Sequence, residues 1–406
     1  KYFSGAIDHQ LSVMAFGKDS IKRKGVWFIH HLGFDKMQRL YNDESDLYND
    51  PITQDEHHFY NFTYNGSTSS DTISHIDFKN RASILYQSGK RVKTFIGPYI
   101  DHHRLKITNL YRDTLFTYNN DTSYRNLAVG AQLTIRKEGG YSIDLQGDYH
   151  PFDDFEAENY KISANFVRWQ SIGFDTLYMH FQYFQRERKP DYLYRRYYSN
   201  HFKWVNNFQD EKEKRLYFNL RLIKSRLNLE FSINQIENYL FFDTDMTINQ
   251  HLDELVVFGG KISKKITWWK GFNVDLNILG QYSSVKIIDL PEIVSRGTFY
   301  YTRDVYFPNT DGTMKVYMGF SGMFHSKYYA PGYVPATGQF YNQRERLIGN
   351  YPVIDVFAGA RIKRFLAFVR VEHVNSGIRG TSYYSAFEYP MPPRNLRFGI
   401  SWNFYN

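Results

Sequence analysis

Cysteine is absent from the 406 residues of the chain. Its absence excludes disulfide scaffolds, cysteine nucleophiles and thiolate metal sites, and it suits an oxidising compartment. Long apolar runs are missing as well: one of the longest spans residues 255–260, directly after Asp253 and Glu254. A helix that crosses a bilayer needs about 20 apolar residues. The sequence therefore predicts no transmembrane helix.

The excess of positive charge is small. Lys and Arg number 50 against 42 Asp and Glu, which leaves a net charge of +8 scattered along the chain. This balance argues against a nucleic-acid partner. The chain also opens at Lys1 directly into patterned sequence, without the features of an export signal. We expect it to be mature or trimmed, with its N-terminal part truncated.

Aromatic residues make up 18% of the chain, and apolar residues alternate with polar ones in long runs. Successive side chains of a strand point to opposite faces, so each run predicts a strand with one apolar and one polar face. No helical repeat of comparable length occurs. The runs include residues 127–135, 216–222, 227–234, 272–278 and 396–404.

The length of these runs separates two β architectures. They cover about 9–13 residues, the length that a tilted strand needs to cross a bilayer, and their polar faces carry Asn, Arg, Asp, Glu and Tyr. Such a face suits a water-filled lumen, and an open sheet edge in lipid would leave unpaired backbone groups. The sequence predicts an all-β protein: a transmembrane antiparallel β-barrel of about 18 strands (range 16–20), a single domain over residues 1–406.

The predicted connections alternate in length, as expected for short periplasmic turns and long outer loops. Short turns fall at residues 223–225, 267–271, 309–312 and 362–364, and long loops at 242–251, 282–296, 326–351 and 374–393. Upstream of about Asn200 the alternation fails, because residues 187–194 are too long for a turn and residues 137–140 too short for a loop. Either the strand phases slip there, or segments are missing.

Charged residues on the polar faces are candidates for the lining of a lumen. They could select ions by charge, or they could pair across neighbouring strands into a structural network, which their balance of four cations and four anions favours. The candidates are Arg221, Glu230, Asp275, Asp355, Arg361, Arg370, Glu372 and Arg397.

Aromatic residues form two further groups. Those at strand ends predict a girdle at the membrane–water interface: Trp268, Trp269, Trp402, Phe404 and Tyr405. Those of the outer loop at residues 326–351 should fold onto the rim or into the mouth of the barrel and constrict it, with sugar stacking or partner docking as the alternative: Tyr328, Tyr329, Tyr333, Phe340 and Tyr341.

Metal and catalytic motifs are weak. Three His-His pairs occur at residues 30–31, 57–58 and 102–103, but neighbours within a strand point to opposite faces and cannot chelate one ion. The acidic stretch 41–56 is interpreted as a solvated loop, with a weak divalent-cation site as the alternative. The sequence contains none of the common hydrolase, P-loop or dinucleotide motifs. We expect no metal site, no cofactor and no enzymatic activity.

Five phrases of the C-terminal half carry a family resemblance: Asn238–Thr244, Tyr328–Tyr341, Ile348–Pro352, Val371–Asn375 and Arg397–Tyr405. In this order they resemble the putative porin family of outer-membrane β-barrels found in Bacteroidota. The N-terminal half resembles the family only in its general residue pattern. The resemblance implies a barrel of the Gram-negative outer membrane, monomeric or associated with a complex.

These observations predict a porin-like channel for ion transport and for passive diffusion of small hydrophilic solutes. The main alternative is a structural barrel with an occluded lumen, serving as a subunit of a larger outer-membrane complex. A third possibility is the barrel of an energised transporter, although no plug segment is visible. The expected partners are outer-membrane lipid, lipopolysaccharide and, for a complex, other outer-membrane proteins. The solute and the oligomeric state do not follow from the sequence.

Overall fold

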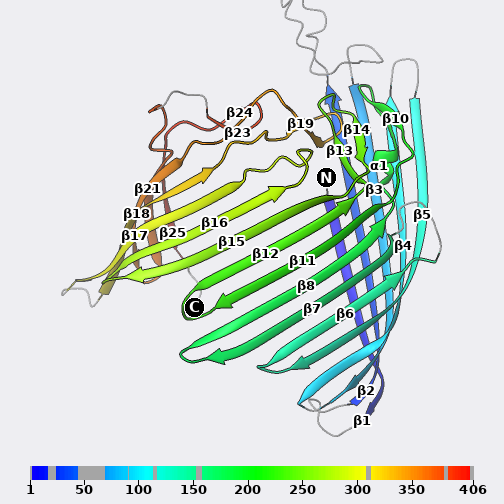
Figure 1. Ribbon diagram of the computed structural model, residues 1–406, viewed down its shortest axis with the longest axis horizontal. Coiled ribbons are helices and arrows are strands. Elements are labelled where there is room, and N and C mark those ends of the chain that lie inside the picture. Colours follow the sequence, from blue (N-terminus) through cyan, green and yellow to red (C-terminus); the bar gives the residue numbers. More distant parts are fainter. Residues whose placement is uncertain are drawn as a thin grey trace, which may run out of the picture.

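One curved antiparallel sheet forms most of the molecule (Figure 1). The computed structural model describes residues 2–16, 24–43, 69–89, 91–112, 117–151, 158–307, 312–378 and 383–402. In the described part of the chain, no helix is long and apolar enough to span a membrane. The sequence prediction of an all-β fold with about 18 strands is confirmed, since the sheet has 17 strands.

The strands of this sheet follow one another in chain order, each antiparallel to the next. They are β1 (Tyr2–Phe16), β2 (Lys24–Asp43), β3 (Ser69–Ser88), β4 (Val92–Arg112), β5 (Thr117–Lys137), β6 (Tyr141–Tyr149), β7 (Glu158–Ile172), β8 (Asp175–Arg188), β11 (Glu211–Leu222), β12 (Leu227–Glu237), β15 (Leu255–Trp268), β16 (Phe272–Ser283), β17 (Ile293–Phe307), β18 (Gly312–His325), β21 (Val353–Ile362), β22 (Phe365–Glu372) and β25 (Asn395–Trp402).

Cross-strand pairing gathers the apolar residues on one face. Leu220 pairs with Leu229, Leu229 with Ile262, and Ile262 with Ile278, which gives a continuous apolar row across four strands. At the end of the sheet, Phe398 of β25 is 81% exposed. An apolar surface of this extent, built from strands long enough to cross a bilayer, is typical of a lipid-facing wall.

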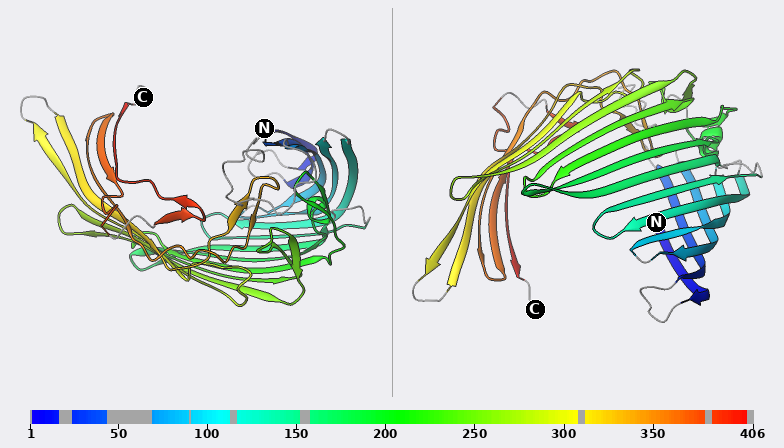
Figure 2. Two further views of the ribbon diagram at one scale, coloured as in Figure 1. Left: turned by 90° about the horizontal axis from the view of Figure 1, so that it is seen from above. Right: turned by 60° about the horizontal axis from the view of Figure 1, so that its bottom comes forward.

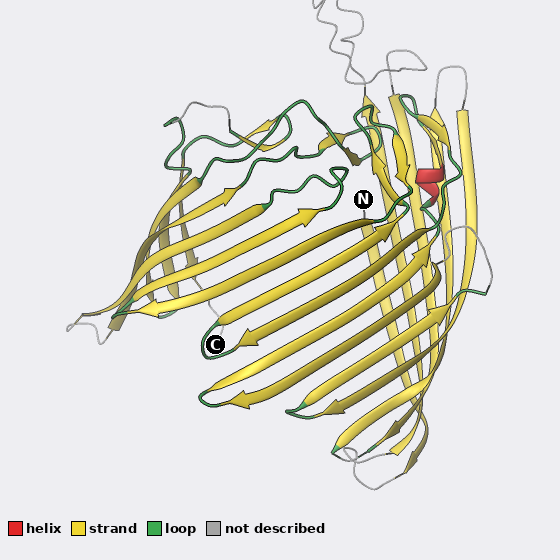
Figure 3. Ribbon diagram, in the orientation of Figure 1, coloured by secondary structure: helices red, strands yellow, loops and turns green. Residues whose placement is uncertain are grey.

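The polar face lies on the inside of the curve. The outer loops fold into the concavity, as Figure 2 shows from above, and they contact side chains of the polar face, such as Arg39 of β2. The longest strands, β4 and β5, each have 21 residues, about twice the 9–11 that a bilayer needs. The sheet therefore extends well beyond the membrane on its loop side (Figure 3).

The long connections carry short elements of their own. They are the single helical turn α1 (Tyr192–Arg195) and four hairpins formed by β9 (Arg196–Tyr198) with β10 (Lys203–Val205), β13 (Tyr239–Phe242) with β14 (Ile248–His251), β19 (Gly332–Val334) with β20 (Gln339–Tyr341), and β23 (Tyr384–Ala386) with β24 (Tyr389–Pro390). All of them belong to connections on the same side of the sheet.

The strand boundaries explain why the alternation of turns fails upstream in the sequence. The turn between β5 and β6 and the turn between β7 and β8 are both short, and the connection from β8 to β11 is long. Residues 137–140 therefore form a short turn, and residues 187–194 enter a long loop. The sequence pattern does not reveal these boundaries because β2 to β5 are 20 or 21 residues long. Each of these strands therefore contains polar residues that lie outside the membrane and interrupt the alternation.

The sheet has two edges, β1 and β25. Among the described residues, no pairing joins these two strands, and both views of Figure 2 show them apart. The seventeen described strands thus form an open, barrel-like wall, and the closing contact expected from the sequence is not made between them.

Candidate functional site

The pairing register places all eight charged residues predicted to line the lumen on one face of the sheet. Arg221 pairs with Asn228, Asp275 with Lys265, and Arg397 with Arg370. This face is the concave one, on which the outer loops fold. The register decides this arrangement, since a shift of one residue would turn every one of these side chains toward lipid.

Four of the eight form one chain of ion pairs near the C-terminal edge. Arg370 lies 2.5 Å from the Asp355 carboxylate and 3.9 Å from that of Glu372, and Glu372 in turn lies 2.8 Å from Arg397. Three neighbouring strands, β21, β22 and β25, supply these residues. Charge-assisted pairs of this kind hold two side chains in a defined geometry, so the chain stiffens the wall at the same time as it sets its local charge.

The other predicted residues have local partners. Glu230 pairs with Lys261 at 3.1 Å and Asp275 with Lys265 at 3.5 Å. Arg221 donates to the side-chain oxygen of Asn228 at 3.5 Å, and Arg361 donates to the backbone carbonyl of Lys363 at 3.2 Å. Neither arginine has a carboxylate within ion-pair distance among the described residues.

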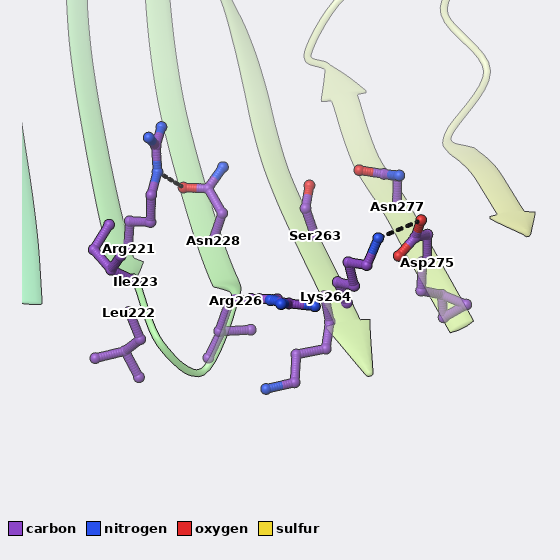
Figure 4. Close-up of a pocket in the computed structure, with 12 residues that line it drawn as sticks. Arg221, Leu222, Ile223, Arg226, Asn228, Ser263, Lys264, Asp275 and Asn277 are labelled. Atoms are coloured by element: carbon purple, nitrogen blue, oxygen red, sulfur yellow. Dashed lines mark hydrogen bonds and ion pairs between the residues drawn. The ribbon is translucent and has the colours of Figure 1, made fainter. Parts of the chain in front are cut away.

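A groove of about 500 Å³ lies at the short-turn end of this face (Figure 4). Arg221 and Asn228 stand on one side of it, and Asp275 and Asn277 on the other, with Ser263 between them. The groove is open to solvent and lined by polar groups of both signs. Its polar groups can take the place of water molecules around small solutes and ions that pass along the groove.

A second polar network was missed in the sequence, because the strand phases slip in the N-terminal half. Lys79 lies 2.9 Å from Asp77 and 3.6 Å from Asp35, and His103 also binds Asp77. Beside them, Arg81 makes a two-point contact with Asp101 at 2.6 and 2.5 Å. The sequence does carry a signal for this network: charged residues stand at every second position, 77, 79 and 81. The concave wall of β2 to β4 is therefore as polar as that of the C-terminal strands.

The outer loops build a small hydrophobic core of their own, which we call the loop cap. Its buried residues come from three connections, those from β12 to β15, from β18 to β21 and from β22 to β25, and are Phe242, Ile248, Val334, Ala336, Tyr341 and Phe387. Tyr41 of β2 and Trp204 of β10 pack against them. Because a side chain buried from water contributes about 1.5–3 kcal/mol, the loops hold one another in place over the concave face.

Arg39 anchors the loop cap to the wall. Its guanidinium donates to the Ala336 carbonyl at 2.6 Å and to the Tyr197 hydroxyl oxygen at 3.0 Å, and Tyr197 donates to the same carbonyl at 2.8 Å. Burial raises the pKa of Tyr197 to about 12, although the nearby charge of Arg39 lowers it. Tyr197 therefore remains a neutral hydrogen-bond donor at all physiological pH values.

The five aromatic residues predicted in the outer loop have different surroundings. Tyr341 is buried in the loop cap against Phe387, while Tyr328 packs edge-on against His325 at 5.5 Å. Arg344 stacks on the Tyr329 ring at 5.1 Å. Tyr333 and Phe340 contact each other at 5.3 Å and are exposed to solvent. The loop thus folds onto the rim, and one pair of rings stays open to solvent.

The two histidine pairs that the structure describes, at residues 30–31 and 102–103, do not gather metal ligands. His30 contacts the Asn80 side chain at 2.8 Å, whereas His103 binds Asp77; residues 57–58 and 44–56 lie outside the described part of the chain. No group of three or more His, Cys, Asp or Glu side chains within the described ranges could hold a metal ion.

A comparison with protein-family models matches residues 6–406 to the putative porin family. The chain belongs to this family. The match extends over nearly the whole chain. It thus includes the N-terminal half, where the sequence resemblance is limited to the general residue pattern. A comparison with curated protein sequences finds no match.

Solved outer-membrane β-barrel receptors and transporters share the fold. They include the copper transporter OprC (TM-score 0.61, 11% identity, 99% of this chain and 65% of that one), the ferric enterobactin receptor PfeA of Pseudomonas aeruginosa (0.61, 10%, 99% and 62%) and the siderophore receptor PirA of Acinetobacter baumannii (0.56, 10%, 99% and 62%). The chain spans less than two thirds of the length of each. At an identity of 10–11%, this similarity shows only that the fold is shared.

This protein of the porin family is an outer-membrane, channel-like protein, and its convex face is apolar, as expected of a surface exposed to lipid. Trp268 and Trp269 lie at the short turn after β15 and are 70% and 72% exposed. Trp402 ends β25 and packs edge-on against Phe365. These three occupy the positions expected of an interfacial girdle; Phe404 and Tyr405 lie outside the described residues.

Proposed function

We propose that this porin-family protein passes ions and small hydrophilic solutes across the outer membrane by passive diffusion. The observation that carries the proposal is the continuous polar lining of the concave face, from the network around Asp77 to the ion-pair chain from Asp355 to Arg397. A wall of fixed charges of both signs replaces part of the hydration shell of a passing ion. Transport down a gradient then needs neither a cofactor nor a covalent step.

Conductance of the purified full chain in planar bilayers tests this proposal. We expect discrete, stable current steps that scale with salt concentration. A preparation that runs on gels as a folded, heat-modifiable barrel and yet stays electrically silent at high salt contradicts it. The gel control separates a closed protein from an unfolded one.

The loop cap favours a second candidate, the structural barrel of a larger outer-membrane complex. Four outer connections pack together over the concave face, and they leave Tyr333 and Phe340 exposed to solvent. Such a lid could occlude the lumen and dock a second outer-membrane protein. Gentle detergent extraction followed by native gel electrophoresis distinguishes the two: stoichiometric companions favour the structural role, and an isolated conducting species favours the channel.

A further inference from the structure

Three aromatic side chains form a patch on the concave face near the C-terminal edge of the sheet. Tyr317 of β18, Phe357 of β21 and Phe368 of β22 lie on three neighbouring strands, and the Tyr317 and Phe357 rings are 6.2 Å apart. Two of the three rings are phenylalanines, which have no polar group to offer a water-filled interior. They contribute nothing to the lipid-facing surface.

Glycines on the adjoining strands let two of these rings lie against the wall. Gly359 is paired with Tyr317, and a Cβ atom at Gly359 would collide with the Tyr317 ring. Gly399 is paired with Phe368, and a Cβ atom there would stand 2.7 Å from that ring. Aromatic side chains commonly cover glycines of neighbouring strands in this way. The patch therefore places aromatic rings close over the backbone of the wall.

Two arginines and two hydroxyl groups surround the patch. Arg296, Arg370, Thr298 and Ser321 line, together with the three rings, a hollow of about 300 Å³. Arg370 is committed to Asp355 through its terminal nitrogen, and its Nε lies 3.9 Å from the Glu372 carboxylate. Arg296 is exposed and has no carboxylate within ion-pair distance among the described residues. The hollow thus holds one positive charge, that of Arg296, which no carboxylate of the described residues compensates at ion-pair distance.

The combination identifies a class of ligand. Guanidinium groups bind carboxylates and phosphates, the faces of aromatic rings stack on the C–H surfaces of flat molecules, and the hydroxyl groups can exchange hydrogen bonds with a polar ring. The volume is at the low end for small-molecule sites, about 300–1,000 Å³, which suits one ring and not a chain of them. A metal cation would be repelled, and a simple inorganic anion would gain nothing from the rings.

We propose that this hollow binds an acidic monosaccharide of the hexuronate type during its passage through the channel, an inference that rests on the proposed diffusion function. The sugar carboxylate lies at Arg296. The sugar ring stacks on Tyr317 and Phe368, and its hydroxyl groups exchange hydrogen bonds with Ser321 and Thr298. The site makes the pathway selective for such solutes without closing it to ions.

Single-channel recording with added glucuronate, glucose or acetate tests the proposal. We expect glucuronate to interrupt the current reversibly, and at least tenfold more potently than glucose or acetate at equal ionic strength. Arg296→Gln and Phe368→Leu should each weaken the glucuronate block at least fivefold. Arg136→Gln, which removes an arginine from the same face at β5, should leave it unchanged. Heat-modifiable gel mobility verifies that each variant is folded.

Calorimetric titration of the full chain in detergent with glucuronate distinguishes a failure of the sugar site from a failure of the proposed diffusion function. A protein that conducts and neither is blocked by nor binds glucuronate overturns the sugar site and leaves the channel standing. A protein that never conducts but binds glucuronate in an Arg296-dependent way overturns diffusion and supports the site. Equal responses to acetate and glucuronate, or a block insensitive to Phe368→Leu, overturn the role of the rings.

Discussion

The guanidinium of Arg39 in β2 donates a 2.6 Å hydrogen bond to the backbone carbonyl of Ala336, 297 residues further along the chain. Through this contact an outer loop from the C-terminal half is tied to the N-terminal wall of the sheet. Tyr197, from a third segment, donates to the same carbonyl. The loop cap is therefore held by one polar junction as well as by its hydrophobic core.

Replacing Arg39 should loosen the loop cap. Arg39→Gln removes charge-assisted hydrogen bonds worth about 1.5–3 kcal/mol each, so amide exchange at residues 334–341 should quicken by roughly 10- to 100-fold. If the cap restricts the lumen, single-channel conductance rises as well. Arg226→Gln, at the opposite end of the sheet, is the control. Unchanged exchange in Arg39→Gln would show that the hydrophobic core holds the cap unaided.

Asp71 should make the loop cap sensitive to pH. The residue lies in the part of β3 beyond the membrane, where burial raises the pKa of its carboxyl to about 6, despite the amide hydrogen bond from Asn200 and the charge of Arg39. The folded state binds this proton more tightly than the unfolded chain, whose pKa is about 3.9. Stability should therefore fall as pH rises from about 4 to 6.

Asp71→Asn keeps an acceptor for the Asn200 amide and removes the buried charge. At neutral pH it should stabilise the protein by about 2–3 kcal/mol, seen as a higher melting temperature in detergent, and the difference should vanish near pH 4. Asp253→Asn, in an exposed position, makes the same change in net charge elsewhere. A parallel pH profile for wild type and Asp71→Asn would refute this assignment.

Removing the carboxylate of Asp355 should shift ion preference. Asp355→Asn leaves Arg370 without its 2.5 Å partner, so the interior gains positive charge and the reversal potential in a salt gradient moves toward that of anions. Loss of this half-buried charged partner should also cost about 1–3 kcal/mol of stability. Asp253→Asn again controls for net charge. An unaltered reversal potential would mean that the ion-pair chain is structural and does not face the permeation path.

A charge placed on the convex face should interfere with membrane assembly. Phe398→Arg puts a guanidinium into lipid, at a cost of about 2–4 kcal/mol if the site is near the bilayer midplane. Ser401→Arg introduces the same group on the concave face of the same strand, where water can solvate it. Folding yield into lipid vesicles should drop for Phe398→Arg only. Equal losses for both variants would contradict the assignment of the faces.

Much of the fold follows from the sequence in the C-terminal half. There the runs of alternating residues match strands such as β12 and β25, and the short turns at residues 223–225 and 267–271 fall where strands end. In the N-terminal half the strand boundaries could not be assigned in this way. Strands such as β4 continue beyond the bilayer, and the polar residues of that extension interrupt the alternation of apolar and polar positions. The polar network around Asp77 was missed for this reason.

Local sequence determined that the chain forms strands with one apolar and one polar face, because the side-chain period of a strand is fixed by its backbone. It also determined which charges share the polar face, since they keep the same parity along each strand. Only the tertiary structure decided which charges pair, which rings cover a glycine of the next strand, and how four distant connections meet in the loop cap. Those contacts join strands and loops far apart in the chain, so they depend on register and curvature, which no single segment encodes.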